Sequence, residues 1–310
     1  MPTPVLSGGD GGRTTVSQLL GNPLLIPARI LDILQNAFIS ETLLRDAGAN
    51  SNGMVQYEEE TPLYLDGDLA DVAEFGEIPV AAGQIGLPRI AVGSKKALGV
   101  RVSREMRDEN KIDRVNTQMR QLSNTAIRGQ EAALRALLLN PSIPTIAASA
   151  AWTSGSSKIR RDIANAQEVI ATAKPTASQG NDLLGFEANT VVFPGSITPV
   201  LIDNEEFLKV YKDSLSTEDI RYTGKMPKKV LDLDALKTRT WPNDRVLVVE
   251  RGTVGFYSDT RKLESTGMYP EGNGPNGGKT ETWRSDTSYK RVMGIDQPKA
   301  ACWITGVQSA

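Results

Sequence analysis

Three stretches of the chain carry apolar residues at the spacing of an amphipathic helix. Residues 27–38 follow Pro27, which suits a first helical turn, and their apolar face fits either a core position or a contact with another subunit. Residues 157–173 form a second such stretch. The longest stretch, 103–140, opens at Ser103, a good N-cap, and stops at Asn140-Pro141. Its periodic positions are Ile112, Val115, Met119, Leu122, Ala126, Gly129, Ala133 and Ala136.

This long stretch predicts one continuous helix of about 54 Å at ~1.5 Å per residue. Small residues dominate its periodic positions and Gly129 interrupts them, so the pattern disfavours a coiled coil. A long helix that lies along a sheet fits the pattern better.

The rest of the chain alternates between strand patterns and turn residues. Strands are expected at 54–57, 98–102, 189–193, 246–249 and 300–307, the fourth being the most buried. Asp203 with Glu206 predicts a capping box that opens a helix through Tyr211. Residues 1–26 are rich in Gly, Pro, Ser and Thr, which predicts an irregular arm that orders only on assembly. The fold class is therefore α+β.

About forty residues, with several Gly and Pro among them, separate the first two expected strands, and so long a connection is usually functional. This segment is acidic, because residues 56–88 hold eight carboxylates and no Lys or Arg. They are Glu58, Glu59, Glu60, Asp66, Asp68, Asp71, Glu74 and Glu77. Residues 95–135 are basic, with ten Lys and Arg against five Asp and Glu. The whole 310-residue chain has a net charge of −2 and no basic block at either end, so no arm or stripe for nucleic acid is predicted.

Composition excludes several kinds of site. The chain has no histidine, which removes His-based triads and His metal sites. Its single cysteine, Cys302, lies in an apolar strand and is expected to be a buried hydrophobe. No apolar run reaches the ~18 residues of a membrane span, and no signal peptide is evident, so synthesis in the cytoplasm is the expectation. We expect no catalytic residue, no cofactor and no metal.

A glycine-rich stretch, Gly272 to Thr280, resembles a nucleotide-binding loop. It contains Gly272-x-Gly274-x-x-Gly277 and ends in Gly-Lys-Thr, but a phosphate-binding loop would need glycine at position 273, which is Asn. The flanking residues read as turn and strand, whereas both nucleotide motifs require a strand followed by a helix. A turn between two strands is the preferred interpretation, and a nucleotide-binding enzyme is the distant alternative.

The order of these parts resembles the major capsid protein of tailed double-stranded DNA bacteriophages, the Hong Kong 97-type capsid fold. The segment Asp71-Val72-Ala73-Glu74-Phe75-Gly76-Glu77-Ile78-Pro79 resembles the acidic part of that family's extended loop. The segment 98–106 resembles the strand that leads into its spine helix, and Asp296-Gln297-Pro298-Lys299-Ala300-Ala301 resembles the start of its closing strand. The resemblance covers nearly the whole chain.

The resemblance implies a division of the chain along its length. Residues 1–50 would be an N-terminal arm, 51–102 the extended loop, and 103–149 the peripheral domain with its spine helix. Residues 150–250 would form the axial domain, 251–297 a β-hairpin return through the peripheral domain, and 298–310 the closing strand of the axial domain. The hairpin tip, near local three-fold contacts, would hold Gly272, Gly274, Asn276 and Gly277.

The function implied is that of a non-enzymatic shell subunit that forms hexamers and pentamers around double-stranded DNA, assembled in the host cytoplasm for the virion capsid. A separate scaffolding protein, a portal protein and a decoration protein are the implied partners, and no membrane is involved. The acidic loop is expected to dock on a neighbour's basic residues Arg104, Arg107 and Lys111. Residues 56–94 hold no lysine, so the covalent cross-link of some relatives is not expected. An encapsulin-type nanocompartment is the alternative.

Overall fold

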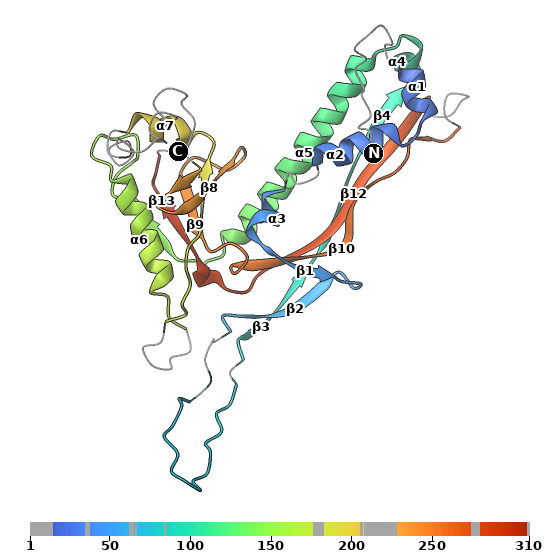
Figure 1. Cartoon of the computed structure of the whole chain (residues 1–310). Helices are drawn as coiled ribbons and strands as arrows, with labels where there is room; N and C mark the ends of the chain where they lie inside the picture. Colours follow the sequence, from blue (N-terminus) through green and yellow to red (C-terminus); the bar gives the residue numbers. More distant parts are fainter. Residues whose placement is uncertain are drawn as a thin grey trace.

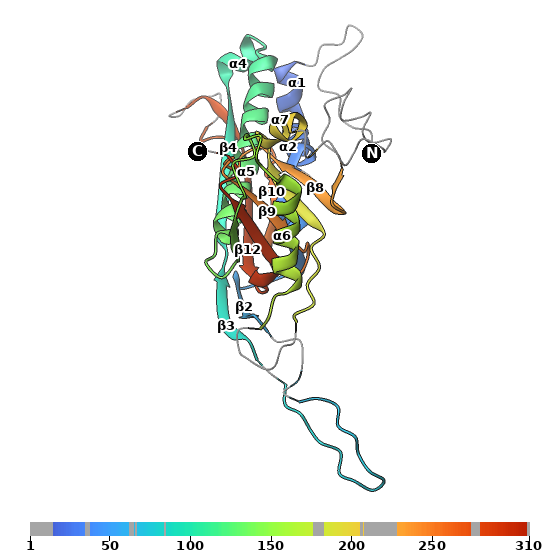
Figure 2. The ribbon, with the colours of Figure 1, turned by 90° about the vertical axis from the view of Figure 1, so that its left-hand side faces the viewer.

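The computed structural model describes residues 15–34, 38–61, 65, 67–83, 85–175, 183–204, 207, 228–273 and 280–308. Two lobes meet at a narrow junction, and a long loop projects from that junction away from both (Figure 1). A view turned by 90° shows that the body is narrow and that the loop extends well beyond it (Figure 2). The loop tip therefore has few neighbours within the chain.

The first lobe is a five-stranded sheet covered by helices. Its strands run in the order β1-β10-β12-β11, and β4 also pairs with β12. The pairing of β12 with β4 is antiparallel from Thr282 opposite Ser103 to Arg291 opposite Ser94. The strands are β1 (Arg45–Ala49), β4 (Ser94–Ser103), β10 (Gly255–Ser265), β11 (Tyr269–Pro270) and β12 (Thr282–Ile295).

The second lobe is a six-stranded sheet in the order β5-β13-β9-β6-β8-β7. Its strand β9 is deeply buried, with Val246 to Val249 fully inaccessible, as the sequence predicts, but β6 is the most buried strand because all five of its residues are buried. Helix α6 (Ile159–Ala171) packs on it through Ile159, Ile163, Ala166 and Ile170, which confirms the predicted face. The strands are β5 (Thr145–Ala147), β6 (Thr190–Pro194), β7 (Lys229–Val230), β8 (Leu233–Thr238), β9 (Arg245–Val249) and β13 (Ala301–Thr305).

The predicted long helix is two helices. Ser103 caps α4 (Arg104–Asp108) by accepting a hydrogen bond from the Met106 backbone, and α5 (Ile112–Leu138) follows after a break. The break falls at Asn110, whose φ of 52° lies in the left-handed region and cannot continue a helix. The continuous helix of 54 Å is therefore wrong, and α5 alone measures about 40 Å at ~1.5 Å per residue.

The buried face of α5 agrees with the predicted spacing only in its first half. Val115, Met119 and Leu122 are buried, but Gln130, Leu134 and Leu138 replace the expected Gly129, Ala133 and Ala136. A straight helix has 3.6 residues per turn, so its buried face drifts away from a strict seven-residue repeat. The seven-residue repeat therefore describes the buried face of α5 only in the first half of the helix.

The N-terminal segment contains helices where the composition predicts an irregular arm. Thr15 and Gln18 form a capping box that starts α1 (Val16–Gly21), and α2 (Leu25–Leu34) and α3 (Ile39–Leu43) follow. Val16 and Leu19 are buried in the same core cluster as Met119 of α5. Helix α2 buries Ile30 and Leu34 within the chain, so its apolar face serves the core. The prediction of irregular structure is wrong at α1, and residues 1–14 lie outside the described part.

The predicted capping box at Asp203 is also misplaced. Asp203 is the last residue of helix α7 (Ile197–Asp203), and the neighbouring Asn204 side chain accepts a hydrogen bond from the Phe207 backbone. Glu206 and Tyr211 lie outside the described residues. An Asn residue can end one helix and cap the next turn, and its side chain takes that role here.

Candidate assembly surfaces

The extended loop leaves the body through a two-stranded antiparallel ribbon. Its strands are β2 (Met54–Glu59) and β3 (Leu87–Val92), paired from Met54 opposite Val92 to Glu59 opposite Leu87. Tyr57 of β2 packs edge-on against Phe256 of β10 with ring centroids 5.2 Å apart. The root of the loop is thus fixed to the five-stranded sheet.

The three consecutive glutamates at this root are engaged within the chain. Glu59 is 4% exposed, and its Oε2 accepts a hydrogen bond of 2.7 Å from Arg89 Nε on the opposite strand. Glu58 Oε2 lies 3.4 Å from the Thr61 hydroxyl, and Glu60 pairs with Lys299 at 3.4 Å. Arg89 follows directly after the segment that sequence reasoning judged purely acidic, so that reading misses the compensating charge.

The described part of the loop beyond the ribbon is exposed except at Thr61, Ala81 and Gly86, which are half-buried. Asp68, Glu74 and Glu77 are exposed, and Asp66 lies outside the described residues. Large apolar side chains are exposed there too, with Leu69, Phe75 and Val80 accessible to 105%, 99% and 95%. The sequence analysis considered only the carboxylates of this loop and missed its apolar residues, although they are present in the sequence.

The basic residues predicted to receive the loop already have partners in their own chain. Arg104 pairs with Asp108 and with Glu281, the latter at 3.3 Å. Arg107 pairs with Asp108 at 2.9 Å, and its guanidinium lies 5.1 Å from the ring centre of Trp283. Lys111 pairs with Glu109. These cations are partly neutralised, which weakens any field they offer to a neighbour.

The glycine-rich stretch joins two antiparallel strands, as the preferred interpretation predicts. Tyr269 of β11 pairs with Arg284 of β12, and Pro270 pairs with Trp283. Gly272 has a φ of 67°, a conformation that glycine adopts readily. Gly274, Asn276 and Gly277 lie outside the described residues. A nucleotide loop requires a helix after it, whereas strand β12 follows this stretch.

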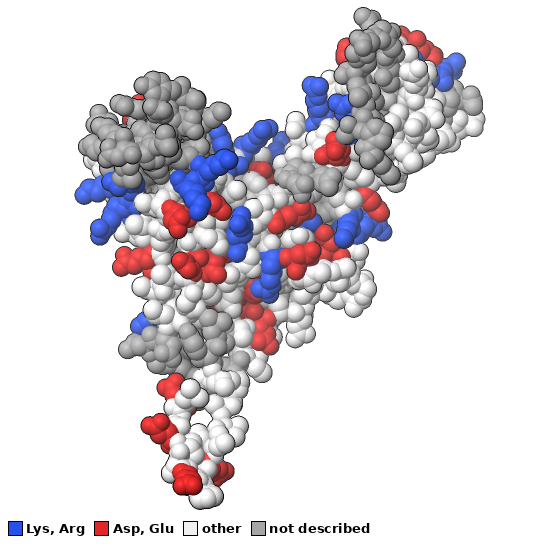
Figure 3. Space-filling model, in the orientation of Figure 1, with Lys and Arg blue, Asp and Glu red and all other residues white. Residues whose placement is uncertain are grey.

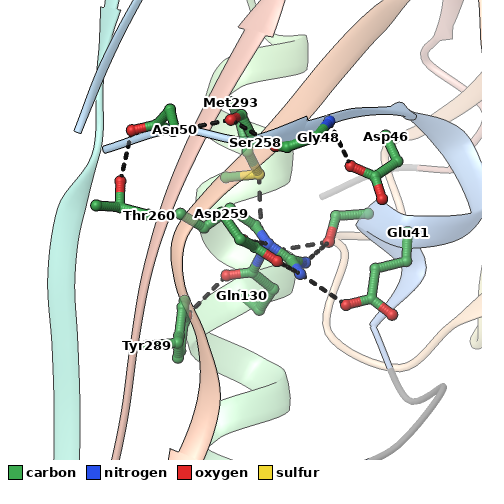
Figure 4. Close-up of polar contacts among 12 residues, drawn as sticks. Glu41, Asp46, Gly48, Asn50, Gln130, Ser258, Asp259, Thr260, Tyr289 and Met293 are labelled. Atoms are coloured by element: carbon green, nitrogen blue, oxygen red, sulfur yellow. Dashed lines mark hydrogen bonds and ion pairs between the residues drawn. The ribbon is translucent and has the colours of Figure 1, made fainter. Parts of the chain in front are cut away.

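A buried arginine joins three elements of the first lobe, and no sequence signal predicts it. The side chain of Arg291 on β12 is 8% exposed and forms two bonds to Asp259 of β10, of 2.7 and 2.8 Å. Its Nη2 also lies 2.8 Å from Glu41 of α3. Burial lowers the pKa of Arg291, but its bonds to Asp259 and Glu41 outweigh burial and raise it. Figure 4 shows both carboxylates directed toward this centre.

The same network reaches α5. The Tyr289 hydroxyl donates a 2.7 Å hydrogen bond to Gln130, whose amide nitrogen donates to Ser40 of α3 at 3.2 Å (Figure 4). Gln130 is 1% exposed. The network therefore fixes α3, α5, β10 and β12 to one another, close to the point where the ribbon of the loop is attached.

The two sheets meet at Asp296, which follows β12 directly. The Asp296 side chain pairs with Arg45, and its backbone oxygen accepts a 2.8 Å hydrogen bond from Glu60 at the loop root. Burial raises the pKa of Asp296 and outweighs the opposing effect of Arg45. The position of the loop is thus coupled to the junction between the lobes.

The outward side of α5 carries four arginines that sequence reasoning did not group together, of which three are exposed and Arg135 is half-buried. Arg114, Arg120, Arg128 and Arg135 are spread over 22 residues, so no basic block is visible in the letters. Figure 3 shows Lys and Arg side chains along the edge of α5 and in the notch between the lobes. The expectation that the chain has no basic stripe is wrong, because helical spacing brings distant residues onto one face.

The single cysteine, Cys302, lies buried in β13. Burial raises the pKa of the Cys302 thiol to about 12, so it stays protonated and unreactive. The described part of the chain contains no cluster of three or more His, Cys, Asp or Glu residues placed to share a metal ion. Among the described helices, none is long and apolar enough to cross a membrane.

Residues 88–303 match the model of a family described as phage capsid protein. No curated protein sequence matches the chain. Among solved structures, a chain of Gordonia phage Cozz is similar with a TM-score of 0.56 and 12% identity, covering 99% of each chain. A chain of Microbacterium phage Oxtober96 gives a TM-score of 0.57 and 13% identity, covering 86% of this chain and 92% of that one.

A third similar structure is titled as a virus-like particle from Pyrococcus furiosus, with a TM-score of 0.55, 11% identity, and coverage of 90% and 97%. At these identities the likeness shows the fold. The resemblance to major capsid proteins of tailed phages, and the α+β fold expected from it, are confirmed. The family match spans well over half of the chain, which therefore belongs to the phage capsid protein family and has the Hong Kong 97-type capsid fold.

Proposed function

We propose that this capsid shell protein self-assembles into hexamers and pentamers of an icosahedral particle that encloses double-stranded DNA. Membership of the phage capsid family and the fold support a structural, non-enzymatic role in the virion. Assembly takes place in the host cytoplasm. A separate scaffolding protein, a portal protein and a decoration protein complete the proposed set of partners.

The proposed division of the chain follows the two sheets except at three strands. Strands β1 and β4 lie in the ranges of the arm and the loop but pair in the five-stranded sheet, and β5 lies within 103–149 but pairs in the six-stranded sheet. The arm, residues 1–50, and the extended loop, 51–102, serve contacts between subunits. The five-stranded lobe acts as the peripheral domain, from residues 103–149 and 251–297. The six-stranded lobe acts as the axial domain, from 150–250 and the closing strand in 298–310. The hairpin tip at Gly272 belongs to the peripheral domain and contacts neighbours near a local three-fold axis.

The exposed loop is the observation that carries the proposal. A single two-stranded ribbon is marginally stable in water, and this one continues into a loop with Leu69, Phe75 and Val80 almost fully accessible. Exposed apolar groups of this kind mark interaction sites. A neighbouring subunit that covers the loop removes this apolar surface from water and stabilises the projecting conformation.

Apolar contact is expected to contribute more to this docking than charge. Asp68, Glu74 and Glu77 are exposed and face a neighbour with complementary charge in the proposal, but exposed pairs contribute only ~0–1 kcal/mol each. Arg104, Arg107 and Lys111 remain the proposed receiving residues, and their internal partners reduce the field that they present.

The test is co-expression of the protein with its proposed scaffolding protein, followed by electron microscopy of the purified particles. Wild-type protein should form closed shells, and Phe75→Asp should remain unassembled because it places a charge where an apolar contact is needed. Leu183→Asp, at a residue 43% exposed in the other lobe, is the matched control and should assemble. Normal shells from Phe75→Asp would show that the loop is not needed for assembly. If the wild-type protein forms no closed shells, the proposal that it is a shell subunit is wrong.

An encapsulin-type nanocompartment is the second candidate, since the virus-like particle of Pyrococcus furiosus shares the fold. The two kinds of particle differ in what they enclose. Particles that protect double-stranded DNA from nuclease and carry a tail vertex support the phage head, whereas particles filled with a cargo enzyme support the nanocompartment. The distant enzyme alternative predicts micromolar binding of ATP or NAD that Lys279→Ala abolishes.

A further inference from the structure

The solvent face of α5 is cationic along its length. Arg114, Arg120, Arg128 and Arg135 follow one another at intervals of six, eight and seven residues, each close to two helical turns. They span about 30 Å at ~1.5 Å per residue. The helix has two carboxylates, and one of them, Glu131, is 5% exposed and bonded to the Thr240 hydroxyl.

None of these four arginines forms an ion pair with any described residue, although sixteen ion pairs link other described charges. Arg135 also has a buried Nε atom with no hydrogen-bond partner among the described atoms. A capsid subunit with net charge −2 therefore keeps a row of cations uncompensated on one rigid helix.

The row continues into a cleft beside α5. The cleft has a volume of about 620 Å³ and lies between the helix, which contributes Arg128, and the end of β8, which contributes Lys237 and Arg239. Lys237 and Arg239 are exposed and likewise have no carboxylate partner in the described part of the chain. Two elements from different lobes thus add cations to the same surface (Figure 3).

We propose that this row, Arg114, Arg120, Arg128, Arg135, Lys237 and Arg239, is a contact surface for the phosphate backbone of double-stranded DNA. The inference rests on the proposed function, because it assigns the genome-facing side of the proposed shell to α5 and its cleft. Contact is independent of sequence, since phosphates carry no sequence information.

Arginine is the first reason to assign a phosphate ligand. All four cations of α5 are arginines, whose planar guanidinium binds phosphate oxygens in pairs, and none is the more compact lysine. Their spacing along a straight helix suits a polyanion with charges repeated over tens of ångströms. Double-stranded DNA carries one charge per ~1.7 Å of its axis, so every arginine meets a phosphate in some register.

The polarity of the surface is the second reason. No large apolar side chain within α5 is among the exposed ones of the described residues, although Leu139 directly after the helix is 42% exposed, and most of the exposed large hydrophobics lie in the loop and its ribbon. Protein interfaces bury apolar and aromatic groups at their centre, whereas protein–DNA interfaces are more polar and more positively charged. The outward side of α5 therefore resembles a protein–DNA interface, whereas the loop resembles a protein–protein interface.

Binding of a 30-base-pair duplex of mixed sequence to the full-length unassembled subunit, followed by fluorescence anisotropy from 50 to 200 mM salt, tests the proposal. The triple variant Arg114→Gln, Arg120→Gln, Arg128→Gln should bind at least about tenfold more weakly at 100 mM salt. Its slope of log affinity against log salt should be shallower by about 3, because each phosphate contact contributes roughly 0.9. Glutamine is a good helix former, so α5 should persist.

Two variants serve as controls. Lys158→Gln, Arg161→Gln, Lys228→Gln removes three exposed cations of the other lobe, equal in charge, and should leave affinity and slope unchanged. Replacing the three α5 arginines by lysine keeps the charge and should restore the wild-type slope. Equal losses in the α5 and control triples would overturn the proposal, since binding would then follow net charge alone.

A competitor separates DNA from an acidic protein partner. Poly-L-glutamate at equal charge concentration should displace the duplex poorly, and displacement as effective as that by unlabelled duplex would overturn the phosphate assignment. Failure here is distinct from failure of the proposed function. If the shells protect DNA and the α5 triple variant binds duplex as well as wild type does, only the assignment of the α5 surface is wrong. If the shells contain no DNA, the proposed function is wrong.

Discussion

Arg291 is a buried charge that links three elements of the first lobe. Its side chain is buried, carries a charge, and bonds to carboxylates on β10 and α3 that lie 32 and 250 positions away in sequence. Removal of one member of a buried ion pair leaves the other members charged and desolvated, which costs far more than loss of an exposed pair.

We expect Arg291→Gln to lower the free energy of unfolding by about 3–5 kcal/mol, measured by urea denaturation of the unassembled subunit. Arg261→Gln is the matched control, because Arg261 pairs with Glu264 on the same sheet with both side chains about half exposed. Its expected cost is about 0–1 kcal/mol. Similar costs for the two variants would show that Arg291 is solvated or dispensable.

Asp296, at the junction of the sheets, predicts a dependence of stability on pH. Burial raises its pKa, so the folded chain binds a proton more readily than the unfolded chain does. Its contribution to stability is fully present below about pH 4, the ordinary Asp pKa, and is lost as pH rises through the raised value. The asparagine side chain in the Asp296→Asn variant has no titratable group, so this variant serves as the reference.

The free energy of unfolding of wild type minus that of Asp296→Asn should therefore decrease between about pH 3.5 and pH 7. Urea denaturation of both proteins at several pH values measures this difference. A difference that stays constant or grows with pH would mean that the pairing with Arg45 dominates over burial.

At the scale of elements, the break between α4 and α5 determines how the N-terminal segment packs. Asn110 adopts a φ of 52° and its side-chain oxygen accepts a 2.8 Å hydrogen bond from the backbone of Val16, the first residue of α1. One residue thus ends a helix and satisfies a free N–H group at the start of another. Asn is among the few residues that adopt the left-handed region with little penalty.

Substitutions at Asn110 should separate these two roles. Asn110→Gly retains the backbone freedom and loses only the side-chain bond, so we expect a cost of about 1 kcal/mol. Asn110→Ala loses both and should cost about 2 kcal/mol or more. Urea unfolding measures both, and equal costs for Gly and Ala would show that the left-handed conformation contributes nothing.

At the scale of the whole molecule, the loop determines how subunits are held together. Residues 56–94 contain no lysine, so a lysine-based cross-link through the loop is not available. Boiled and reduced particles should run on a denaturing gel near the 33.5 kDa monomer. A ladder of pentamer- and hexamer-sized bands would contradict this prediction and would point to a lysine outside the loop.

Local periodicity was enough to predict the elements whose neighbours are set by their own pattern. The face of α6, the burial of β9 and the strands on either side of the glycine-rich stretch all follow from alternation or helical spacing within a few residues. The sequence pattern also predicted the order of structural elements from which the capsid fold was inferred. These features depend on interactions between residues near in sequence.

The tertiary structure alone decided which charges are neutralised. Glu59 meets Arg89 across the ribbon and Arg291 meets Glu41 across 250 positions, so loop acidity and core charge could not be judged from composition. The arginines of α5 form one surface only because the helix aligns them and no described partner reaches them. Electrostatic energy depends on distance in space and on burial, and sequence position specifies neither for residues that the fold brings together.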